Sequence, residues 1–243
     1  MHVIIPARFA ATRLPGKPLR EVAGAPLIVR VYERALASGA ERVTVATDDT
    51  RIAAVIQARG GDVVMTSADH ASGTDRIAEA VIKLGLKASD IVVNCQGDEP
   101  MMPPALISQV GAALAAHPHW SMATAAHALT DPGEFQSPHV VKVLRDLEGR
   151  ALYFSRAPIP WPRHAEPVAP RLRHIGLYAY RVDFIRTFTT WGPGVLEQCE
   201  GLEQLRALEH GAAIGVVLTD EIPGPGVDTE ADLARVNALW KPL

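Results

Sequence analysis

Three cations lie close together near the N-terminus, in the stretch IIPARFAATRLPGKPL. Arg8, Arg13 and Lys17 follow an apolar run, and prolines stiffen the segment while Gly16 can adopt backbone angles that other residues avoid. One arginine side chain can form two parallel hydrogen bonds to phosphate oxygens, and a lysine adds a point charge. The pattern indicates a polyphosphate site, although a solvated basic loop has the same composition.

Two common phosphate-binding motifs do not fit this stretch. The P-loop motif GxxxxGK[ST] needs glycine at position 11 and serine or threonine at position 18, where the chain has Ala11 and Pro18. The dinucleotide fingerprint GxGxxG fails because Gly16 is the single glycine of the stretch. What remains is a stiff loop that carries three cations.

A second polar group follows the apolar run DIVVNC. Gln96, Gly97, Asp98 and Glu99 come directly after this run. A carboxylate beside a cationic phosphate site is a natural Mg²⁺ ligand, because Mg²⁺ binds one or two carboxylates together with substrate phosphates and water. The alternative is that Asp98 and Glu99 are turn residues ahead of a helix that begins at the following pair of prolines.

Asp228 offers a further carboxylate late in the chain, in the segment PGPGVDTEADL. It follows a Gly/Pro turn and precedes an amphipathic segment, so it suits the N-cap of a helix. It could equally be the second carboxylate of a metal site. The spacing alone leaves both interpretations open.

The segment TSADHASGTDRIAEA predicts the start of a helix. Ser72 and Asp75 have the spacing of a capping box. Gly73 and the free N-terminus of this helix could also approach a ligand closely. Arg76 is harder to explain as a purely structural residue, since a cation in the first turn opposes the helix dipole.

The segment RHIGLYAYR has the alternation of a strand with two different faces. Ile175, Leu177 and Ala179 would point to a core, while His174 and Tyr178 would share the other face with Gly176 and Tyr180. Hydrogen-bonding side chains around a gap suit a polyhydroxylated ligand.

Polar residues that could join this face occur in two other segments. ALYFSR contributes Ser155 and Arg156, and GLEQLRALEHG contributes Glu203 and Gln204 beside a spine of leucines. The alternative for Glu203 is a solvated i,i+3 ion pair with Arg206.

Alternating strands and helices must position these groups. Four short apolar runs, HVIIPA, RVTVAT, DVVMT and DIVVNC, predict strands. Each precedes a segment with helical spacing: Leu27–Ala37, Ile52–Ala58, Ile77–Leu84 and Leu106–Leu114. The pattern predicts an α/β fold, a doubly wound, mostly parallel sheet with helices on both faces. Ligands are then expected at the carboxyl ends of the strands.

The second half of the chain differs from the first. From about Ala123 the segments VVKVLRD, ALYFSR and RHIGLYAYR predict a β-rich excursion, and helices return at Val182–Phe188, Leu202–Glu209 and Ala231–Leu239. The proline-rich stretch Pro158–Pro170 predicts a surface loop. With no sharp change of composition, we expect a single domain over residues 1–243.

Composition restricts the partners of this 243-residue chain. A hydrophobic fraction of 48% indicates a substantial core, and a net charge of −3 provides no general field for nucleic acid or anionic lipid. No apolar stretch approaches the roughly 20 residues of a membrane span, and the N-terminus lacks the features of a signal peptide, so we expect a cytoplasmic protein. Cys95 and Cys199 form no CxxC pair, which argues against a zinc site, and Cys95 is expected to be buried.

Eight ordered segments from about Val3 to Leu239 resemble the 3-deoxy-manno-octulosonate cytidylyltransferase (CMP-Kdo synthetase) family. They are IIPARFAATRLPGKPL, ATDD, ADHASGTDRIAE, VVNCQGDEPM, ALYFSRAPIPW, RHIGLYAYR, LEQLRALEHG and GVDTEADL. The resemblance implies a Rossmann-like nucleotidyltransferase that joins CTP and 3-deoxy-manno-octulosonate (Kdo) to give CMP-Kdo and diphosphate, for lipopolysaccharide biosynthesis. It also implies a cytoplasmic, Mg²⁺-dependent homodimer, with sugar binding and dimerisation around residues 123–190. A related acceptor, sialic acid or an amino variant of Kdo, is the alternative. The segment between Trp161 and His174 looks shorter than in some members.

The resemblance also implies roles for individual residues. The triphosphate of CTP would meet Arg8, Arg13 and Lys17, and the rest of the nucleotide would meet Ser72, Gly73, Arg76 and Gln96. Asp98 and Asp228 would hold the metal, and together with Arg13 and Lys17 they would form the catalytic group. The residues implied for the sugar acid are Ser155, Arg156, His174, Tyr178, Glu203 and Gln204.

Overall fold

A nine-stranded mixed sheet forms the centre of the molecule, which is known from a computed structural model that describes residues 1–10, 13–163 and 170–242. Seven strands follow the order β11-β7-β10-β6-β1-β4-β5, and the β8–β9 hairpin joins at β10. The strands are β1 (His2–Ala7), β4 (Arg42–Thr47), β5 (Asp62–Met65), β6 (Ile91–Asn94), β7 (Met122–Ala128), β8 (Lys142–Arg145), β9 (Ala151–Ser155), β10 (Leu172–Arg181) and β11 (Ile214–Leu218).

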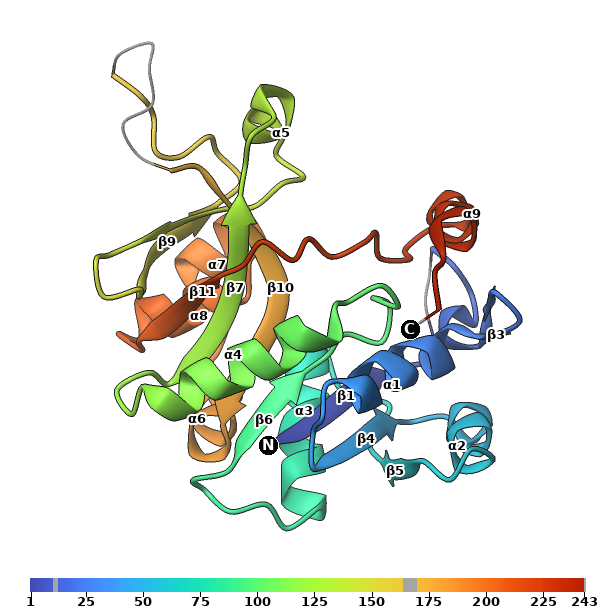
Figure 1. The fold of residues 1–243 in the computed structure, drawn as a ribbon. Helices are drawn as coiled ribbons and strands as arrows, with labels where there is room; N and C mark the ends of the chain where they lie inside the picture. The colour runs from blue at the N-terminus through green and yellow to red at the C-terminus, as the bar shows by residue number, and fades with distance from the viewer. Residues whose placement is uncertain (11–12, 164–169, 243) are drawn as a thin grey trace.

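Helices cover both faces of this sheet (Figure 1). One core cluster contains side chains of α1 (Leu27–Ala37), α2 (Thr50–Gln57) and α4 (Pro104–Ala116), and the other contains side chains of α3 (Gly73–Lys83), α6 (Val182–Phe188) and α8 (Gln204–Glu209). The remaining elements are the 3-10 helix η1 (Lys17–Leu19), the hairpin β2 (Glu21–Val22) and β3 (Ala25–Pro26), α5 (Pro132–Gln136), α7 (Val195–Glu200) and α9 (Glu230–Leu239). The predicted doubly wound α/β sheet is confirmed.

The sheet is parallel except around β10. Strands β6, β1, β4 and β5 run parallel, as do β7 and β11, while β10 runs antiparallel to both β6 and β7. The sequence analysis did not identify β7, β11 or α7 as separate elements. The β7 segment MATAAHA contains mostly alanine and one β-branched residue, so it lacks the usual strand composition.

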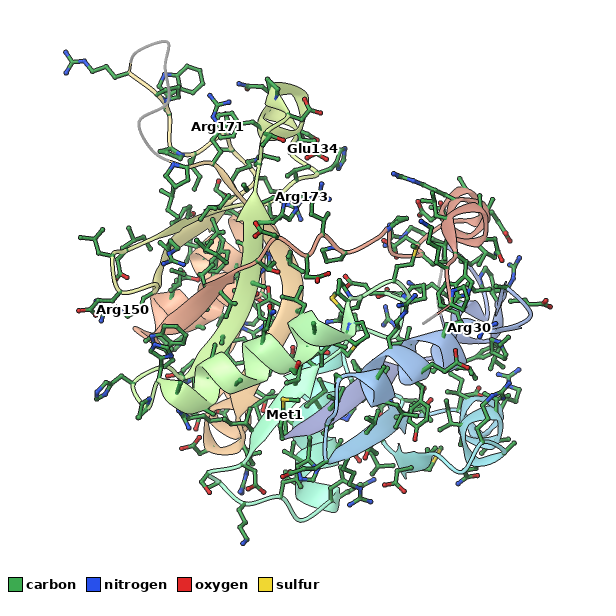
Figure 2. The ribbon with its side chains drawn as sticks, in the orientation of Figure 1. Met1, Arg30, Glu134, Arg150, Arg171 and Arg173 are labelled. Carbon is green, nitrogen blue, oxygen red and sulfur yellow. The ribbon has the colours of Figure 1, made fainter. Side chains whose placement is uncertain are left out.

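One ion pair near the start of β10 fastens the small helix α5 to the sheet. Figure 2 shows Glu134 of α5 and Arg173 of β10 pointing toward one another, and their side chains are 2.7 Å apart. The expected loop Pro158–Pro170 carries no regular structure at residues 158–163 and 170, and its remaining residues lie outside the described part of the chain.

The C-terminal segment crosses the molecule from β11 to α9, which lies beside β3 (Figure 1). Asn237 of α9 accepts a hydrogen bond from the amide of Ala23, and Arg20 pairs with Glu230. These contacts place Asp228, just ahead of α9, next to the N-terminal loop. In the described residues, no helix combines the length and apolar character needed to span a bilayer.

Candidate active site

A cavity of about 370 Å³ opens at the carboxyl ends of β1 and β6. This is the edge where an open α/β sheet binds ligands. The predicted nucleotide and metal residues all line it, namely Arg8, Arg13, Lys17, Ser72, Gly73, Arg76, Gln96, Asp98 and Asp228. Residues up to 220 positions apart in the sequence therefore face one space.

Lys17 lies between the two carboxylates of this cavity. Its Nζ atom is 2.7 Å from Asp98 Oδ2 and 3.0 Å from Asp228 Oδ1, and Arg13 reaches the other oxygen of Asp228 at 3.2 Å. Burial disfavours the charge on Lys17, but the attraction of Asp98 and Asp228 outweighs it and raises the pKa of the lysine. The four side chains form one charged cluster.

For Asp228 the N-cap interpretation is wrong, whereas Asp98 does lie in a turn ahead of α4, as its alternative predicted. Thr229, not Asp228, caps α9, and its hydroxyl accepts from the amide of Asp232. Asp98 lies well ahead of α4, which begins at Pro104, and its carboxylate contacts Lys17 instead of a backbone amide of that helix. Neither carboxylate therefore caps the helix that follows it.

Two glycines let the loops around the cavity approach each other. A side chain at Gly97 would place Cβ only 2.7 Å from the carbonyl oxygen of Pro6, so only glycine allows the ends of β1 and β6 to lie this close. Gly16 has a φ of +66° and lies against the ring of Phe9, which turns the loop into η1 and directs Lys17 inward.

Helix α3 presents its N-terminus to the cavity. Ser72 and Asp75 form the predicted capping box, with both hydrogen bonds present. Arg76 is 3% exposed, donates to the Thr66 hydroxyl and lies 3.6 Å from Asp48. These buried partners explain how a cation is tolerated in the first turn of the helix.

His70 also lines the cavity and was not singled out from the sequence. Its Nε2 atom is 2.5 Å from Glu79, which also pairs with Lys83 and accepts from the amide of Ser67. The available signal was its position two residues before the helix cap Ser72.

Glu203 and Gln204 lie beside α3 rather than in open solvent. The Thr74 hydroxyl donates a hydrogen bond of 2.6 Å to the Glu203 carboxylate. Burial raises the pKa of Glu203, although this hydrogen bond and the charge of Arg206 act in the opposite direction. The i,i+3 pair of Glu203 with Arg206 is present at 3.9 Å, but it is not solvated, because Arg206 is largely buried and bonds mainly to Glu197. The Nε2 atom of Gln204 is buried and has no hydrogen-bond partner among the described residues.

The core face of β10 is as the alternation predicted, but Tyr180, expected on the polar face, is buried in the other core cluster. Ile175, Leu177 and Ala179 belong to one core cluster. His174 and Tyr178 are partly exposed on the other side, with ring centres 5.5 Å apart. Tyr178 pairs with Asn94 at the end of β6, two residues before the cavity residue Gln96. This face therefore lies next to the candidate nucleotide site.

Ser155 and Arg156 do not line the cavity. Both are bound to the end of α7. Ser155 donates to Glu200 over 2.6 Å, and Arg156 donates from its side chain to the carbonyls of Glu200 and Pro138. In this structure their polar atoms serve packing between β9 and α7.

The donor set of the cavity suits a hard cation. Among the described residues, no cluster of three or more His, Cys, Asp or Glu side chains could enclose a metal. Asp98 and Asp228 instead supply two carboxylates at an open position, the arrangement that Mg²⁺ uses with substrate phosphates. Burial raises the pKa of the neighbouring Glu99 to about 7, and the charges of these two aspartates add to this effect.

Comparison with known proteins shows the family of this chain. The sequence model of the family described as cytidylyltransferase matches residues 2–214. The chain is similar to a 3-deoxy-manno-octulosonate cytidylyltransferase of Cellvibrio japonicus (strain Ueda107), with 55% identity over 98% of this chain and 97% of that protein.

Solved structures show the same relationship. A CMP:2-keto-3-deoxy-manno-octonic acid synthetase complexed with CTP superposes with a TM-score of 0.91 and 44% identity, over 98% of this chain and 96% of that one. A cytidylyltransferase from Leptospira borgpetersenii serovar Hardjo-bovis (strain JB197) has a TM-score of 0.64 and 15% identity, over 97% and 84% of the two chains, which is similarity of fold alone.

Proposed function

Because this chain belongs to the cytidylyltransferase family, we propose that it transfers CMP from CTP to 3-deoxy-manno-octulosonate and releases diphosphate. The observation that carries the proposal is the convergence of Asp98 and Asp228 on Lys17 in a cavity lined by arginines. This arrangement is suited to a nucleoside triphosphate and its metal, and a simple sugar-binding module would have no use for it.

The nucleotide is assigned to the cavity itself. Arg8, Arg13 and Lys17 bind the triphosphate, where charge-assisted hydrogen bonds to phosphate oxygens are strong. Ser72, Gly73, Arg76 and Gln96 complete the nucleotide site. Arg76 acts with its position already fixed by Thr66 and Asp48, so little side-chain entropy is lost when CTP binds.

The metal is assigned to Asp98 and Asp228. Bound Mg²⁺ would supply charge stabilisation at the α-phosphate and orient the triphosphate. Before CTP binds, Lys17 and Arg13 offset the charges of the two aspartates. The ammonium group of Lys17 is then available for the phosphates that arrive with the nucleotide.

The sugar acid is assigned to the polar face of β10 and the start of α8. His174, Tyr178, Glu203 and Gln204 form its wall, and the unpaired amide of Gln204 is a ready hydrogen-bond donor. Ser155 and Arg156 belong to the same proposal, with the difference that both must exchange their present bonds to α7 for bonds to the sugar.

The residues act mainly by positioning and by stabilising charge. The anomeric hydroxyl of the sugar attacks the α-phosphorus of CTP in line with the departing diphosphate. Arg13 and Lys17 offset the negative charge that builds up on the leaving group. Direct attack by the sugar hydroxyl needs no covalent intermediate. Neither cysteine is placed to form one, because Cys95 is fully buried and Cys199 lies outside the cavity.

A cytoplasmic homodimer is part of the proposal. Among the residues that the structure describes, strand β9 pairs with β8 alone, so its other edge is unpaired, and it exposes Leu152. Val195 and Leu196 of the neighbouring α7 are also exposed. A second copy is the occupant proposed for this apolar surface.

A diphosphate-release screen tests the function. Purified protein with Mg²⁺ is offered each of the four ribonucleoside triphosphates with Kdo, sialic acid or an amino variant of Kdo. We expect diphosphate release only for the pair of CTP and Kdo, and strongly reduced release from Asp98→Asn assayed in parallel. Preferential use of sialic acid or of the amino sugar would replace the proposed acceptor, and the absence of release with any pair would refute a nucleotidyltransferase.

A further inference from the structure

Thr124 occupies an unusual place in the centre of the sheet. It lies on β7, is fully buried, and pairs in register with Tyr178 of β10. Just before that pair the register of β10 slips, because Gly176 and Leu177 have no partner on β7 between the pairs of Ile175 and Tyr178. The threonine therefore lies directly at a bulge in the strand that carries His174.

The hydroxyl of Thr124 joins both sides of this bulge. Its Oγ1 atom donates toward the carbonyl oxygens of Leu177 at 2.8 Å and Ile175 at 3.0 Å, and it is 2.9 Å from Nε2 of His174. A hydroxyl has one proton and two lone pairs, and a carbonyl can only accept. With its proton directed to the carbonyls, Thr124 can only accept from His174, so Nε2 must be the ring nitrogen that carries hydrogen.

Other contacts fix the ring in this orientation. Phe154 meets the imidazole edge to face at 5.0 Å, Tyr178 lies 5.5 Å away, and the backbone amide of His174 donates to Val141. The other nitrogen, Nδ1, has no hydrogen bond within the described residues. One lone pair of the ring therefore remains for a ligand.

We propose that Thr124 is a positioning residue that locks His174 in its Nε2–H tautomer, so that Nδ1 accepts a hydrogen bond from a hydroxyl group of the acceptor sugar. The inference rests on the proposed assignment of His174 to the sugar site. Thr124 itself touches no substrate, since it is buried within the sheet. By fixing the tautomer, Thr124 determines that His174 binds a hydrogen-bond donor of the sugar and not an acceptor.

This assignment has a consequence for the sugar carboxylate. Burial lowers the pKa of His174 to about 3, so the ring is neutral at physiological pH. A neutral ring that offers only a lone pair repels a carboxylate and selects a donor. His174 therefore binds a hydroxyl, and the carboxylate of the sugar acid must be met by a different, donating side chain.

The tautomer can be read directly by NMR. In protein labelled with ¹⁵N-histidine, long-range proton–nitrogen spectra distinguish a protonated ring nitrogen from one with a lone pair, and the signals of His174 are identified by their loss in His174→Asn. We expect hydrogen on Nε2 in the wild type, with no change from pH 5 to pH 8. Hydrogen on Nδ1 would overturn the proposal without any further variant.

Kinetics of Thr124 variants give the second arm. Thr124→Val keeps the shape but removes the hydroxyl, and we expect the KM for Kdo to rise roughly three- to tenfold, the range of one uncharged hydrogen bond, with the KM for CTP unchanged. Thr124→Ser retains the hydroxyl and should restore both the KM and the tautomer. Thr44→Val on β4 is the matched control, because it removes a buried strand hydroxyl far from His174.

The two arms separate failure of this inference from failure of the proposed function. If His174→Ala leaves the KM for Kdo unchanged, the sugar assignment of His174 is wrong, whatever the tautomer. If His174→Ala raises that KM while folded Thr124→Val keeps the wild-type tautomer and KM, Thr124 has no positioning role. Should Thr124→Val fail to fold, the wild-type spectrum still shows which ring nitrogen of His174 carries hydrogen. Thr124→Ser then shows whether a hydroxyl at this position keeps the wild-type tautomer and KM.

Discussion

Lys17 pairs with both carboxylates of the cavity. Alone, two carboxylates facing one space would repel each other, and the lysine between them removes this repulsion. The same carboxylates are available to a divalent cation only if Lys17 moves to another anion. Substrate phosphates are such anions, which links metal binding to nucleotide binding in the proposed site.

The metal assignment makes a first prediction. Asp98→Asn and Asp228→Asn should each reduce turnover roughly a hundredfold or more, because an amide is a poor ligand for Mg²⁺ and charge at the α-phosphate loses its stabilisation. Diphosphate release over a range of Mg²⁺ concentrations is the measurement, with circular dichroism to verify folding. A well-folded variant with near-normal turnover would remove that aspartate from the site.

The cationic loop makes a second prediction. Arg13→Ala should raise the KM for CTP while leaving the KM for Kdo unchanged, since a charge-assisted hydrogen bond of roughly 1.5 to 3 kcal/mol is lost on the nucleotide side. Arg20→Ala is a suitable control, because Arg20 follows η1 closely but pairs with Glu230 outside the cavity. Equal effects of the two variants on CTP would contradict the phosphate role of Arg13.

Glu79 makes a third prediction, which concerns pH. Burial opposes its ionisation, but hydrogen bonds from Lys83, His70 and the Ser67 amide outweigh burial and lower its pKa from 4.5 to about 2. A lowered folded-state pKa stabilises the protein above pH 4.5, and this stability is lost as the pH falls toward 2. Solvent around this partly exposed side chain weakens the contribution, so only its sign and pH range are predicted.

Urea unfolding of Glu79→Gln measures this contribution. The variant should be less stable than the wild type at pH 7, and the difference should shrink between pH 4.5 and pH 2. Glu148→Gln, in an exposed turn with a 75% exposed side chain, should show no such trend. A difference that stays constant with pH would mean that the charge of Glu79 is not the stabilising feature.

At the scale of elements, β10 connects the core with the proposed acceptor site. It separates the two parallel parts of the sheet, and its faces serve different purposes. The face with Leu177 is fully buried, whereas the face with His174 and Tyr178 is polar and partly open. Substitutions on neighbouring residues of this one strand should therefore affect different properties.

This contrast is the fourth prediction. Leu177→Ala should cost about 2 to 5 kcal/mol of stability, the usual range for truncating a buried leucine. Tyr178→Phe should leave the Tm nearly unchanged and raise the KM for Kdo. Thermal unfolding and initial rates at varied Kdo test both. If Leu177→Ala is harmless to stability, or Tyr178→Phe is fully active at low Kdo, the assignment of the two faces fails.

At the scale of the whole molecule, the free edge of β9 makes the fifth prediction. If two copies meet there, Leu152→Glu should shift the protein from dimer to monomer, since a buried unpaired charge is costly. Analytical ultracentrifugation is the measurement. Ile82→Glu, which alters an exposed residue of α3, is the control and should remain dimeric. A monomeric wild type would refute the dimer, and a dimeric Leu152→Glu would place its interface elsewhere.

The sequence by itself determined the strands and helices of the first half of the chain. Runs such as HVIIPA and RVTVAT are strongly apolar, and the helices after them have clear periodicity, so local pattern and tertiary packing demand the same structure. The capping box of Ser72 and Asp75 is equally local, because all of its partners lie within one turn. These features needed no distant contact to be predicted.

The tertiary structure decided what depends on distant partners. Asp228 could be a cap or a ligand until α9 packed beside β3 and placed it 3.0 Å from Lys17, 211 positions earlier in the chain. Strand β7 has little intrinsic strand preference and forms because β10 and β11 flank it. The bulge that joins Thr124 to His174 has no local signature either. Contacts across such separations depend on how the whole sheet is ordered, and one-dimensional patterns carry no information about that order.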